Sequence, residues 1–294
     1  MPFKNVGFLY IITTYGEFGK TMKYSAGIIY NKSKANAKKL AFEVALWLKQ
    51  NKFRVFVSDS ISVKCRKADF VLSIGGDGTM LKVIRTFSPL SVPVKGINLG
   101  SLGFLTDTDT NEIFMLLENI LSSGFIIEKR VLLSAEFEYK GRKIKAVAVN
   151  DCVVRSLSGG KLIAVDVNID KNFTVEYKCD GMIIATPTGS TAYSLAAYGP
   201  IVYPNLPVFI LTPISPHTLT QRPMILSDKS NISFIAKNKD IGGKIMISMD
   251  GQENYTLSNR TKIKISLYRK PFKLIKNCSK SYFETLKAKL YWSV

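Results

Sequence analysis

The chain has 294 residues, enough for one large domain or for two of ordinary size. Its hydrophobic fraction of 46% and charged fraction of 21% are those of a globular protein with a core, and no apolar run approaches the roughly 20 residues that cross a bilayer. The formal net charge of +19 suits anionic ligands. Because the lysines are spread thinly and no nucleic-acid-binding motif accompanies them, we expect no specific nucleic-acid partner and no membrane partner.

The cysteines and the single histidine, His217, exclude two common kinds of site. The cysteines stand at positions 65, 152, 179 and 278, with no CxxC pair. This spacing predicts neither a zinc site nor a disulfide framework, and we expect a cytoplasmic protein. The first apolar run, residues 6–12, is short and lacks a small-residue cleavage site, so it is predicted to be a buried strand and not a signal peptide.

In residues 1–125, segments with strand and helix patterns alternate, which predicts a parallel α/β sheet. Ser33 is predicted to cap the first helix, and a second helix is predicted from about Gly78 to Phe87. Asp109 with Glu112 forms a capping-box-like start for a third helix, which Gly124 ends. The other predicted strands are Ser25–Tyr30, Arg54–Val57, Phe70–Ile74 and Val94–Asn98.

After Glu128 the pattern changes to short strands separated by turn signals, which predicts a mainly antiparallel β domain. The tail from Ser281 to Tyr291 has Phe283, Leu286 and Leu290 on one helical face. We therefore expect an α/β domain at 1–128, an all-β domain at 129–267, and a segment at 268–294 that packs back on the first domain. The strands predicted in the second part are residues 131–139, 143–149, 163–169, 173–178, 208–212, 231–236, 244–249 and 261–267.

One predicted strand, Phe70–Ile74, runs into the sequence Gly75-Gly76-Asp77-Gly78-Thr79. Glycines at the carboxyl end of a strand let backbone N–H groups approach an anion, and the following helix adds its positive N-terminal dipole. An aspartate there would repel phosphate, so its presence needs a reason. Asp77 either forms the turn, or it accepts a proton from a hydroxyl nucleophile or helps to hold Mg²⁺. The loop is not a Walker sequence.

Two further segments combine small and polar residues at strand ends. Asn98–Leu105 is a second glycine-rich loop, and two such neighbouring loops would face one crevice, where open α/β sheets bind ligands. Taken alone, this loop could also be an ordinary connection between a strand and a helix. Asp180–Ser194 is a strand followed by a loop whose hydroxyl groups could bind ribose or phosphate while Tyr193 packs on a flat ring. Hydroxyl-rich turns are also common in ordinary loops.

Taken in order, these segments resemble those of the NAD kinases. The loop at 75–79 is shared with phosphofructokinases and with diacylglycerol and sphingosine kinases, whereas the segment 185–194 is far more specific. The resemblance covers about residue 24 to the end, and it implies a phosphofructokinase- or diacylglycerol-kinase-like α/β domain that binds nucleotide, followed by a β domain that binds NAD. It also includes Asn150-Asp151, Thr212–Leu219, Arg222-Pro223, Asp250-Gly251-Gln252 and Phe283–Trp292.

The resemblance implies that the chain phosphorylates the 2′-hydroxyl of the adenosine ribose of NAD to give NADP, with Asp77 as the base. ATP, or polyphosphate in its place, would be the donor, with Mg²⁺ or another divalent cation, and the protein would be a homodimer or homotetramer. No residue is assigned as a metal ligand. The residues implied to bind dinucleotide or nucleotide are Gly75, Gly76, Gly78, Lys82, Phe104, Asn150, Asp151, Lys161, Lys178, Asp180, Thr191, Ala192, Tyr193, Ser194, Leu195, Ala196, His217 and Gln252.

Two positions depart from the family's pattern. Asp151 stands where the family often has glutamate, which keeps the charge and shortens the reach, and Tyr198 stands where it usually has glycine, in the wall of the expected pocket. His217 is a tempting general base because it is the only histidine. Nothing near it supplies a Ser or Cys nucleophile, so we expect it to shape the site instead.

Three other functions predict different features. A lipid or sugar kinase of the same superfamily predicts a lipid slot or a sugar-binding signature in the second half, where this chain has the segment 185–194 instead. A non-catalytic NAD(H) sensor predicts the loss of Asp77, which is present. A nucleic-acid-binding module predicts binding that weakens steeply with salt.

Overall fold

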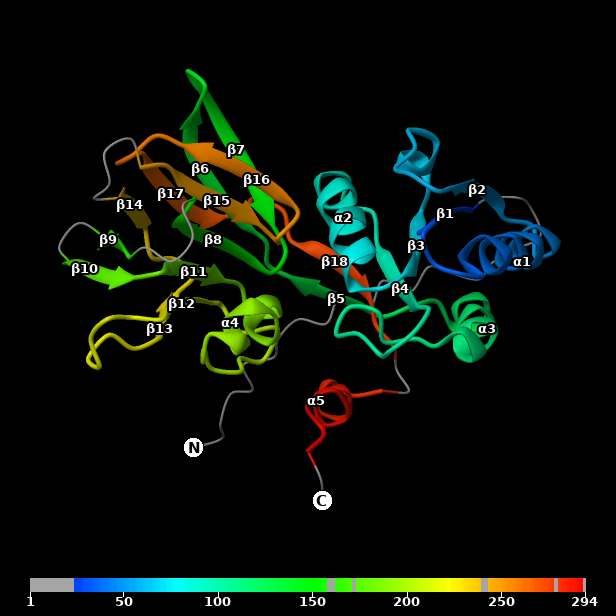
Figure 1. The fold of residues 1–294 in the computed structure, drawn as a ribbon. Coiled ribbons are helices and arrows are strands. Elements are labelled where there is room, and N and C mark those ends of the chain that lie inside the picture. The colour runs from blue at the N-terminus through cyan, green and yellow to red at the C-terminus, as the bar shows by residue number, and fades with distance from the viewer. Residues whose placement is uncertain (1–23, 158–161, 171–172, 239–242, 278–279, 293–294) are drawn as a thin grey trace, which may run out of the picture. The chain divides into compact units, whose positions relative to one another are not determined.

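The computed structural model describes residues 24–157, 162–170, 173–238, 243–277 and 280–292. The chain divides into two compact units, whose elements are labelled in Figure 1. Unit 1 comprises Met1–Lys129 and Phe272–Val294, and unit 2 comprises Arg130–Pro271. The strand predicted at residues 6–12 lies outside the described residues. Within those residues, no helix has the length and apolar character needed to span a membrane.

Unit 1 is built on a six-stranded sheet in the order β2-β1-β3-β4-β18-β5. β1 pairs in parallel with β2 and β3, and β4 pairs in parallel with β3 and β18. β3 is buried along its whole length, as expected for a strand covered on both faces. The strands are β1 Ser25–Tyr30, β2 Arg54–Ser58, β3 Phe70–Gly75, β4 Val94–Asn98, β5 Ile127–Arg130 and β18 Phe272–Ile275.

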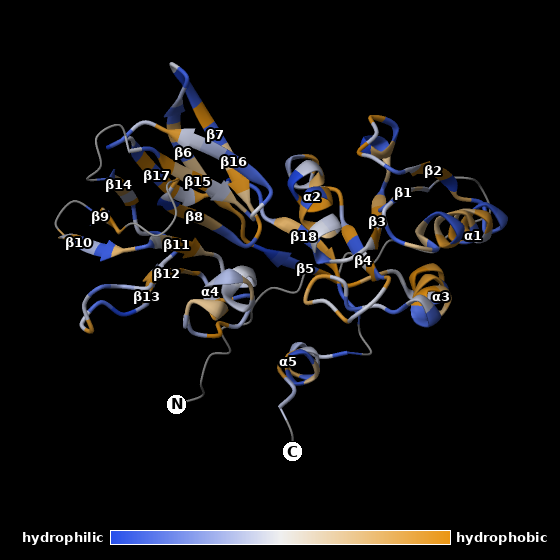
Figure 2. Cartoon of the chain, viewed as in Figure 1, coloured by the Kyte–Doolittle hydropathy of each residue, from blue (hydrophilic) through white to orange (hydrophobic). Residues whose placement is uncertain are grey.

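Helices α1 (Ala37–Gln50) and α3 (Ile113–Ser123) pack on the same face of this sheet, because buried residues of both share a core cluster with Leu72 and Ile74 of β3. Figure 2 shows the hydrophobic colour along β3 and on one side of α1 and α3. Helix α2 (Asp77–Phe87) packs against β3 and β4. Short 3₁₀ turns lie at Lys64–Lys67, Ser88–Leu90 and Thr110–Glu112, and helix α5 spans Tyr282–Leu290.

The sheet order places the two glycine-rich loops side by side. β3 ends at Gly75 and β4 ends at Asn98, and these two residues are partners in the parallel register. β1 has β2 on one side and β3 on the other, which is the reversal of strand order where open α/β sheets bind ligands. The chain therefore carries both loops to one edge of the sheet.

Unit 2 consists of two six-stranded antiparallel sheets, in the orders β10-β9-β14-β17-β6-β7 and β13-β12-β11-β8-β15-β16. Their apolar faces enclose one core, to which Val165 and Phe234 contribute from the first sheet and Val154 and Ile184 from the second. Between β11 and β12 lie a 3₁₀ turn at Thr188–Thr191 and the short helix α4 at Tyr193–Ala196. The strands are β6 Leu133–Tyr139, β7 Arg142–Ala148, β8 Asp151–Ser156, β9 Ile163–Ile169, β10 Phe173–Cys179, β11 Gly181–Ala185, β12 Val208–Ile214, β13 Met224–Ser227, β14 Ile232–Asn238, β15 Ile245–Met249, β16 Glu253–Leu257 and β17 Lys262–Leu267.

The predicted fold class is confirmed, since a parallel α/β sheet is followed by antiparallel β sheets. The prediction that Ser33 caps α1 was wrong. The chain first turns at Asn31, whose side-chain oxygen accepts the Ser33 N–H at 3.0 Å, and α1 begins after Asn36, which has a left-handed φ of 61° and no side-chain cap. Of the three apolar residues predicted to share one face of the tail helix, Leu286 is buried, whereas Phe283 is 66% exposed.

Several short strands were not predicted. They are β5, β13 and β18, which have only four residues each, together with β8 and β16. The four-residue strands carry too little alternation to be recognised. β8 and β16, with six and five residues, were missed although strands of the same length were predicted.

Tyr198 shows how a local conformation departs from residue preference. It follows helix α4 with φ of 61° and is 92% exposed. Its N–H bonds to the Leu195 carbonyl at 3.0 Å, and the next N–H, that of Gly199, bonds to the Ser194 carbonyl at 2.7 Å. This left-handed position after a helix is one that glycine usually fills.

We predict that Tyr198→Gly stabilises the protein, because glycine adopts positive φ without the steric cost that a Cβ imposes. The expected gain in the free energy of unfolding is about 0.5–1 kcal/mol after the larger chain entropy of unfolded glycine is subtracted. Denaturant unfolding measures it. Tyr198→Ala is the matched control, because it removes the same ring but keeps the Cβ; an equal gain in both variants would contradict the prediction.

Candidate functional site

In unit 1 the two glycine-rich loops meet at the carboxylate of Asp77, the first residue of α2. Oδ2 accepts the Phe104 N–H at 2.9 Å. Oδ1 accepts three hydrogen bonds, from the Leu105 N–H at 3.2 Å, the Thr106 N–H at 3.0 Å and the Thr106 hydroxyl at 2.8 Å. A carboxylate offers about four lone-pair positions, two on each oxygen. Oδ1 is therefore fully used, and Oδ2 can accept another hydrogen bond.

Gly103 makes room for this arrangement. A Cβ built on Gly103 would lie 2.1 Å from Asp77 Oδ1 and 2.3 Å from Thr106 Oγ1. Any side chain at this position would push the carboxylate away from the loop. The glycine is therefore required by the close approach of Asp77.

The Gly75–Thr79 loop is open on one side. A Cβ on Gly75 would lie 2.7 Å from Thr79 Oγ1, whereas a Cβ on Gly76 would meet nothing within 4 Å. Thr79 is held in turn by Asn31, whose Nδ2 donates to its hydroxyl oxygen at 3.2 Å. The Lys82 side chain is exposed on α2. The free side of Gly76, next to the N-terminus of α2, leaves space for a ligand to approach the backbone.

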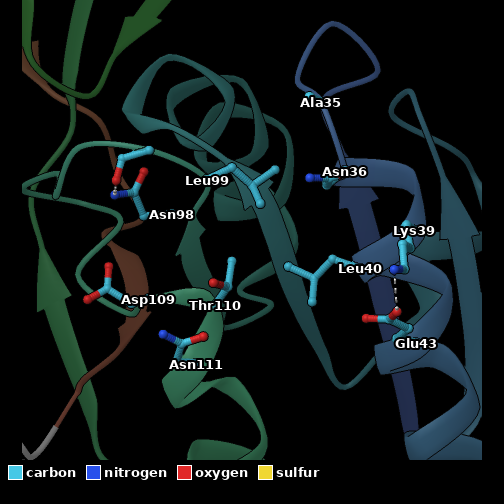
Figure 3. A pocket seen from close by; sticks show the side chains of 11 residues that line it. Ala35, Asn36, Lys39, Leu40, Glu43, Asn98, Leu99, Asp109, Thr110 and Asn111 are labelled. Carbon is cyan, nitrogen blue, oxygen red and sulfur yellow. Dashed lines mark hydrogen bonds and ion pairs between the residues drawn. The ribbon is translucent and has the colours of Figure 1, made fainter.

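A cavity of about 680 Å³ lies at the same edge of the sheet, between the N-terminal ends of α1 and α3 (Figure 3). It does not include Asp77, but it borders the Gly75–Thr79 loop, because the Leu99 N–H donates to the Gly75 carbonyl at 2.9 Å. Its walls carry charges of both signs, including a Lys39–Glu43 ion pair at 3.9 Å. The lining residues are Ala35, Asn36, Lys39, Leu40, Glu43, Asn98, Leu99, Gly100, Asp109, Thr110 and Asn111.

In unit 2 a second aspartate organises a backbone segment. Asp250 lies in the turn between β15 and β16 with φ of 52°, next to Gly251 with φ of 65°. Its carboxylate accepts the N–H groups of Val149 at 3.0 Å, Asn150 at 2.7 Å and Asp151 at 3.2 Å. The Asp250 N–H donates back to the Asp151 carbonyl at 2.9 Å. Asp250 therefore fixes the Asn150-Asp151 pair at the start of β8.

A cavity of about 340 Å³ opens beside this pair. The loop after β11 is held against it by Thr186, whose hydroxyl donates to the Val149 carbonyl at 2.6 Å. Gly189 packs so closely that a Cβ there would lie 2.1 Å from the Asn150 carbonyl oxygen. The cavity is lined by Asn150, Asp151, Val153, Arg155, Ala192, Tyr193, Ser248, Asp250, Gly251 and Asn254.

The pKa of Asp151 is raised to about 7 from 3.8. The first cause is burial, which disfavours the charged carboxylate, and the second is the neighbouring negative charge of Asp250. A hydrogen bond from the Tyr193 N–H acts in the opposite direction and is the smallest of the three effects. Asp151 can therefore change its charge near neutral pH inside the cavity.

The expected binding residues of unit 2 fall into two groups. Asn150, Asp151, Ala192 and Tyr193 come together in the cavity. Ser194 is buried, and its hydroxyl bonds that of Thr212 at 2.9 Å; Thr191, Leu195 and Ala196 are partly exposed or exposed beside it. Gln252 closes the turn through its N–H to the Met249 carbonyl at 3.0 Å.

The second group lies elsewhere. Lys178, Asp180 and His217 are exposed, and the His217 N–H donates to the Lys178 carbonyl at 2.8 Å. They flank the first residue of β11, whereas Asn150 and Asp151 lie at its last residue, so about 13 Å of strand separates the two groups. The two groups of residues therefore do not line a single cavity in unit 2. Lys161 lies outside the described residues.

Four residues of these sites, Gly103, Thr106, Thr186 and Asp250, were assigned no role of their own from the sequence. Two of them position Asp77: Thr106 by hydrogen bonds and Gly103 by leaving room for the carboxylate. The other two, Thr186 and Asp250, hold the backbone of residues 149–151 by hydrogen bonds. The signal for Asp250 was its Asp-Gly dipeptide, which is typical of a turn with positive φ. No local signal joins it to Asn150, because 100 residues separate them.

No group of three or more His, Cys, Asp or Glu side chains that could hold a metal ion occurs in the part of the chain that the structure describes. Buried Cys65, Cys152 and Cys179 are free thiols, and burial raises the pKa of each. Raised thiol pKa values make these cysteines poor nucleophiles.

The chain was compared with known protein families. A model described as the ATP-NAD kinase N-terminal domain matches residues 62–125, and one described as the ATP-NAD kinase C-terminal domain matches residues 149–277. The NAD kinase of Thermoanaerobacter pseudethanolicus is 36% identical over 280 residues, covering 90% of this chain and 98% of the relative. The NAD kinase of Thiobacillus denitrificans is 39% identical over 227 residues, covering 77% of each.

Two solved structures are also similar. An NAD kinase from Archaeoglobus fulgidus in complex with ATP superposes with a TM-score of 0.75 at 28% identity, covering 91% of this chain and 98% of that one. Yeast NADH kinase complexed with NADH gives a TM-score of 0.80 at 23% identity, covering 92% of this chain and 88% of that one. The second likeness supports the fold alone.

We predict that Gly103→Ala destabilises the protein, because the new methyl group overlaps the carboxylate of Asp77. Overpacking of this kind typically costs about 1–3 kcal/mol of unfolding free energy. Gly100→Ala is the matched control in the same loop, because its Cβ would meet nothing within 4 Å. Equal stability of the two variants in denaturant unfolding would show that the position of Asp77 does not require Gly103.

We predict that Asp151→Asn makes the protein relatively more stable as pH rises. Below pH 3.8 the carboxyl is protonated in both the folded and the unfolded state, whereas above about pH 7 the folded protein must hold a buried charge. Relative to the variant, the wild type therefore loses stability between about pH 4 and pH 7, by about 4 kcal/mol at most. Unfolding of both proteins along this pH range measures the difference; a gap that stays constant would contradict the raised pKa.

Proposed function

Since the chain belongs to the NAD kinase family, we propose that it transfers the γ-phosphoryl group of ATP to the 2′-hydroxyl of the adenosine ribose of NAD, forming NADP, with Asp77 as the general base. The family membership confirms the resemblance that the motifs indicated. The observation that carries the assignment of Asp77 is the asymmetric use of its two carboxylate oxygens.

The geometry of Asp77 suits a base. A ribose hydroxyl is a weak nucleophile, and a positioned carboxylate that accepts its proton assists the attack on phosphorus. The three hydrogen bonds on Oδ1 fix the plane of the carboxylate. Oδ2 keeps the capacity to accept a hydroxyl hydrogen. The proton then moves from the ribose oxygen to Oδ2 as the bond to phosphorus forms and the bond to the leaving ADP breaks.

The donor phosphates belong at the Gly75–Thr79 loop. Gly76 has open space beside it, and the N-terminus of α2 places a positive dipole there. A divalent cation fits this site when it is carried by the nucleotide, since Mg²⁺ commonly binds through substrate phosphates and one or two carboxylates. The remaining acceptor position of Asp77 is assigned to the ribose hydroxyl, so the cation would be held through the phosphates. When bound, the cation neutralises charge on the transferred phosphoryl group.

Unit 2 would recognise the dinucleotide. We assign the cavity of about 340 Å³ beside Asn150, Asp151 and Tyr193 to part of NAD, because it combines amide and carboxyl groups with one aromatic ring. In this proposal residues 1–128 bind the nucleotide donor and 129–267 bind NAD. Binding roles for Lys82, Phe104, Lys161, Lys178, Asp180, His217 and Gln252, the homo-oligomeric state, and polyphosphate as a possible alternative donor rest on the family alone.

We predict that Asp77→Asn lowers kcat for NADP formation by about 10²-fold or more, because the amide cannot accept the hydroxyl proton. NAD binding, measured by calorimetry, should change little. The assay follows NADP formed from NAD and ATP. Since the amide group of asparagine also loses the bond from the Phe104 N–H, the position of the loop needs a separate control.

Thr106→Val is that control. It removes one of the three hydrogen bonds on Oδ1 and keeps the carboxylate. We expect a loss of about ten-fold, well below that of Asp77→Asn, since Oδ2 remains a base. Near-normal turnover of Asp77→Asn would exclude Asp77 as the base, and a wild-type protein that forms no NADP would exclude the proposed reaction.

A further inference from the structure

A lysine lies fully buried beneath the loop that holds Asp77. Lys95, on β4, has an exposed fraction of 0%, and its Nζ contacts Asp107 Oδ1 at 2.6 Å. The Asp107 side chain is 20% exposed. Burying an ammonium group is costly even when it is paired, and apolar residues of similar size at such a position are often as stable or more stable. Stability alone therefore gives little reason for a lysine here.

The position of this ion pair connects it with Asp77. Asp107 follows Thr106, which gives Asp77 both its N–H and its hydroxyl. Gly96, the residue after Lys95, lies so close to the same loop that a Cβ there would be 2.4 Å from the Leu105 carbonyl oxygen. β4 thus touches the loop through two consecutive residues, one by charge and one by backbone contact.

The contacts form a closed ring. Asp77 follows β3, and β3 pairs with β4, with Leu72 opposite Lys95 in the register. Lys95 bonds Asp107, and the adjacent Thr106 bonds Asp77. Each link is either a strand pairing, a covalent bond or a hydrogen bond. Two links lie outside the sheet, the Lys95–Asp107 ion pair and the bonds from Thr106 to Asp77, and removing the charge of Lys95 opens the first of them.

The outer side of the loop is held separately. Asn277 Nδ2 donates to the Thr108 hydroxyl oxygen at 3.3 Å, and Lys280 bonds Asp109 at 3.3 Å and Glu112 at 2.9 Å. The Thr108 carbonyl also accepts the Asn98 N–H at 2.9 Å. Asn277 Nδ2 also donates to the Asp107 carbonyl at 3.4 Å, so these outer contacts reach the backbone of Asp107, whereas Lys95 holds its carboxylate.

We propose that Lys95 is a positioning residue for the phosphoryl-transfer reaction: its ion pair with Asp107 holds residues 104–106 where their N–H groups and the Thr106 hydroxyl fix the Asp77 carboxylate. The inference rests on the proposed function, in which Asp77 is the base. Lys95 touches no reacting atom. Its effect is expected on the orientation of Asp77 and hence on kcat, since small displacements of a catalytic group reduce turnover by on the order of 10- to 100-fold.

The test uses four variants of the full-length protein, Lys95→Met, Asp107→Asn, Asp107→Glu and the double variant Lys95→Met with Asp107→Asn. Steady-state NADP formation gives kcat and the KM values for NAD and ATP. We expect Lys95→Met and Asp107→Asn to lower kcat by about ten-fold or more while both KM values stay within about two-fold. The double variant should fall no further than the singles, because the two residues act as one pair. Asp107→Glu, which keeps the charge, should recover part of kcat.

A structural role alone would give a different result. In that case the variants would unfold at lower temperature, and kcat measured well below the melting temperature would be unchanged, which would overturn the proposal. The double variant is the decisive one, because replacing both charges should leave the melting temperature within a few degrees while kcat stays low. If a single variant does not fold, the double variant, which leaves neither charge of the pair behind, carries the same comparison.

Hydrogen exchange gives a readout that does not depend on activity. The N–H groups of Leu105 and Thr106 donate to Asp77, so opening the ring should speed their exchange in Lys95→Met. Peptides from β1 should be unchanged. Unchanged exchange at residues 104–106 would overturn the inference even if NADP is formed. If the wild-type protein has no kinase activity, the proposed function is wrong. The exchange rates would then still show whether Lys95 holds the loop.

Discussion

The carboxylate of Asp77 and the three consecutive residues Phe104, Leu105 and Thr106 form the contact on which the arrangement of unit 1 depends. A loop that turns its N–H groups inward would normally leave them to water or to an anion. Here a side chain from the neighbouring loop satisfies them. The same contact sets the plane of the carboxylate and the path of the loop, which explains why Gly103 has no room for a side chain.

Unit 2 uses the same physical device a second time. Asp250 accepts three successive backbone N–H groups, as Asp77 does. The two sites differ because a second carboxyl group lies beside Asp250. At Asp250 the second carboxyl group, Asp151, is close by and buried, and its pKa is raised to about 7. Asp250 therefore shapes the backbone through its hydrogen bonds, and the neighbouring Asp151 is left able to exchange a proton near neutral pH.

Much of the fold was readable from the sequence because it depends on local pattern. The strand–loop–helix unit at 70–87 and the capping box at Asp109 and Glu112 were predicted within a residue or two. The contact between Asp77 and the second loop was not, since hydrogen bonds across 27 to 29 residues leave no periodic trace. The burial of Lys95 could not be predicted either, because a lysine in a strand pattern indicates an exposed position, and its ion pair with Asp107 is not visible in the sequence.

The position of β18 has a consequence for the order in which the chain can fold. This strand, Phe272–Ile275, lies between β4 and β5, although the whole of unit 2 separates it from them in sequence. During synthesis, the sheet of unit 1 therefore has a vacant place until residue 275 has left the ribosome. Until then β4 and β5 each present an unpaired edge, and such edges readily pair with other chains. The last tenth of the sequence thus decides when the first half is protected from aggregation.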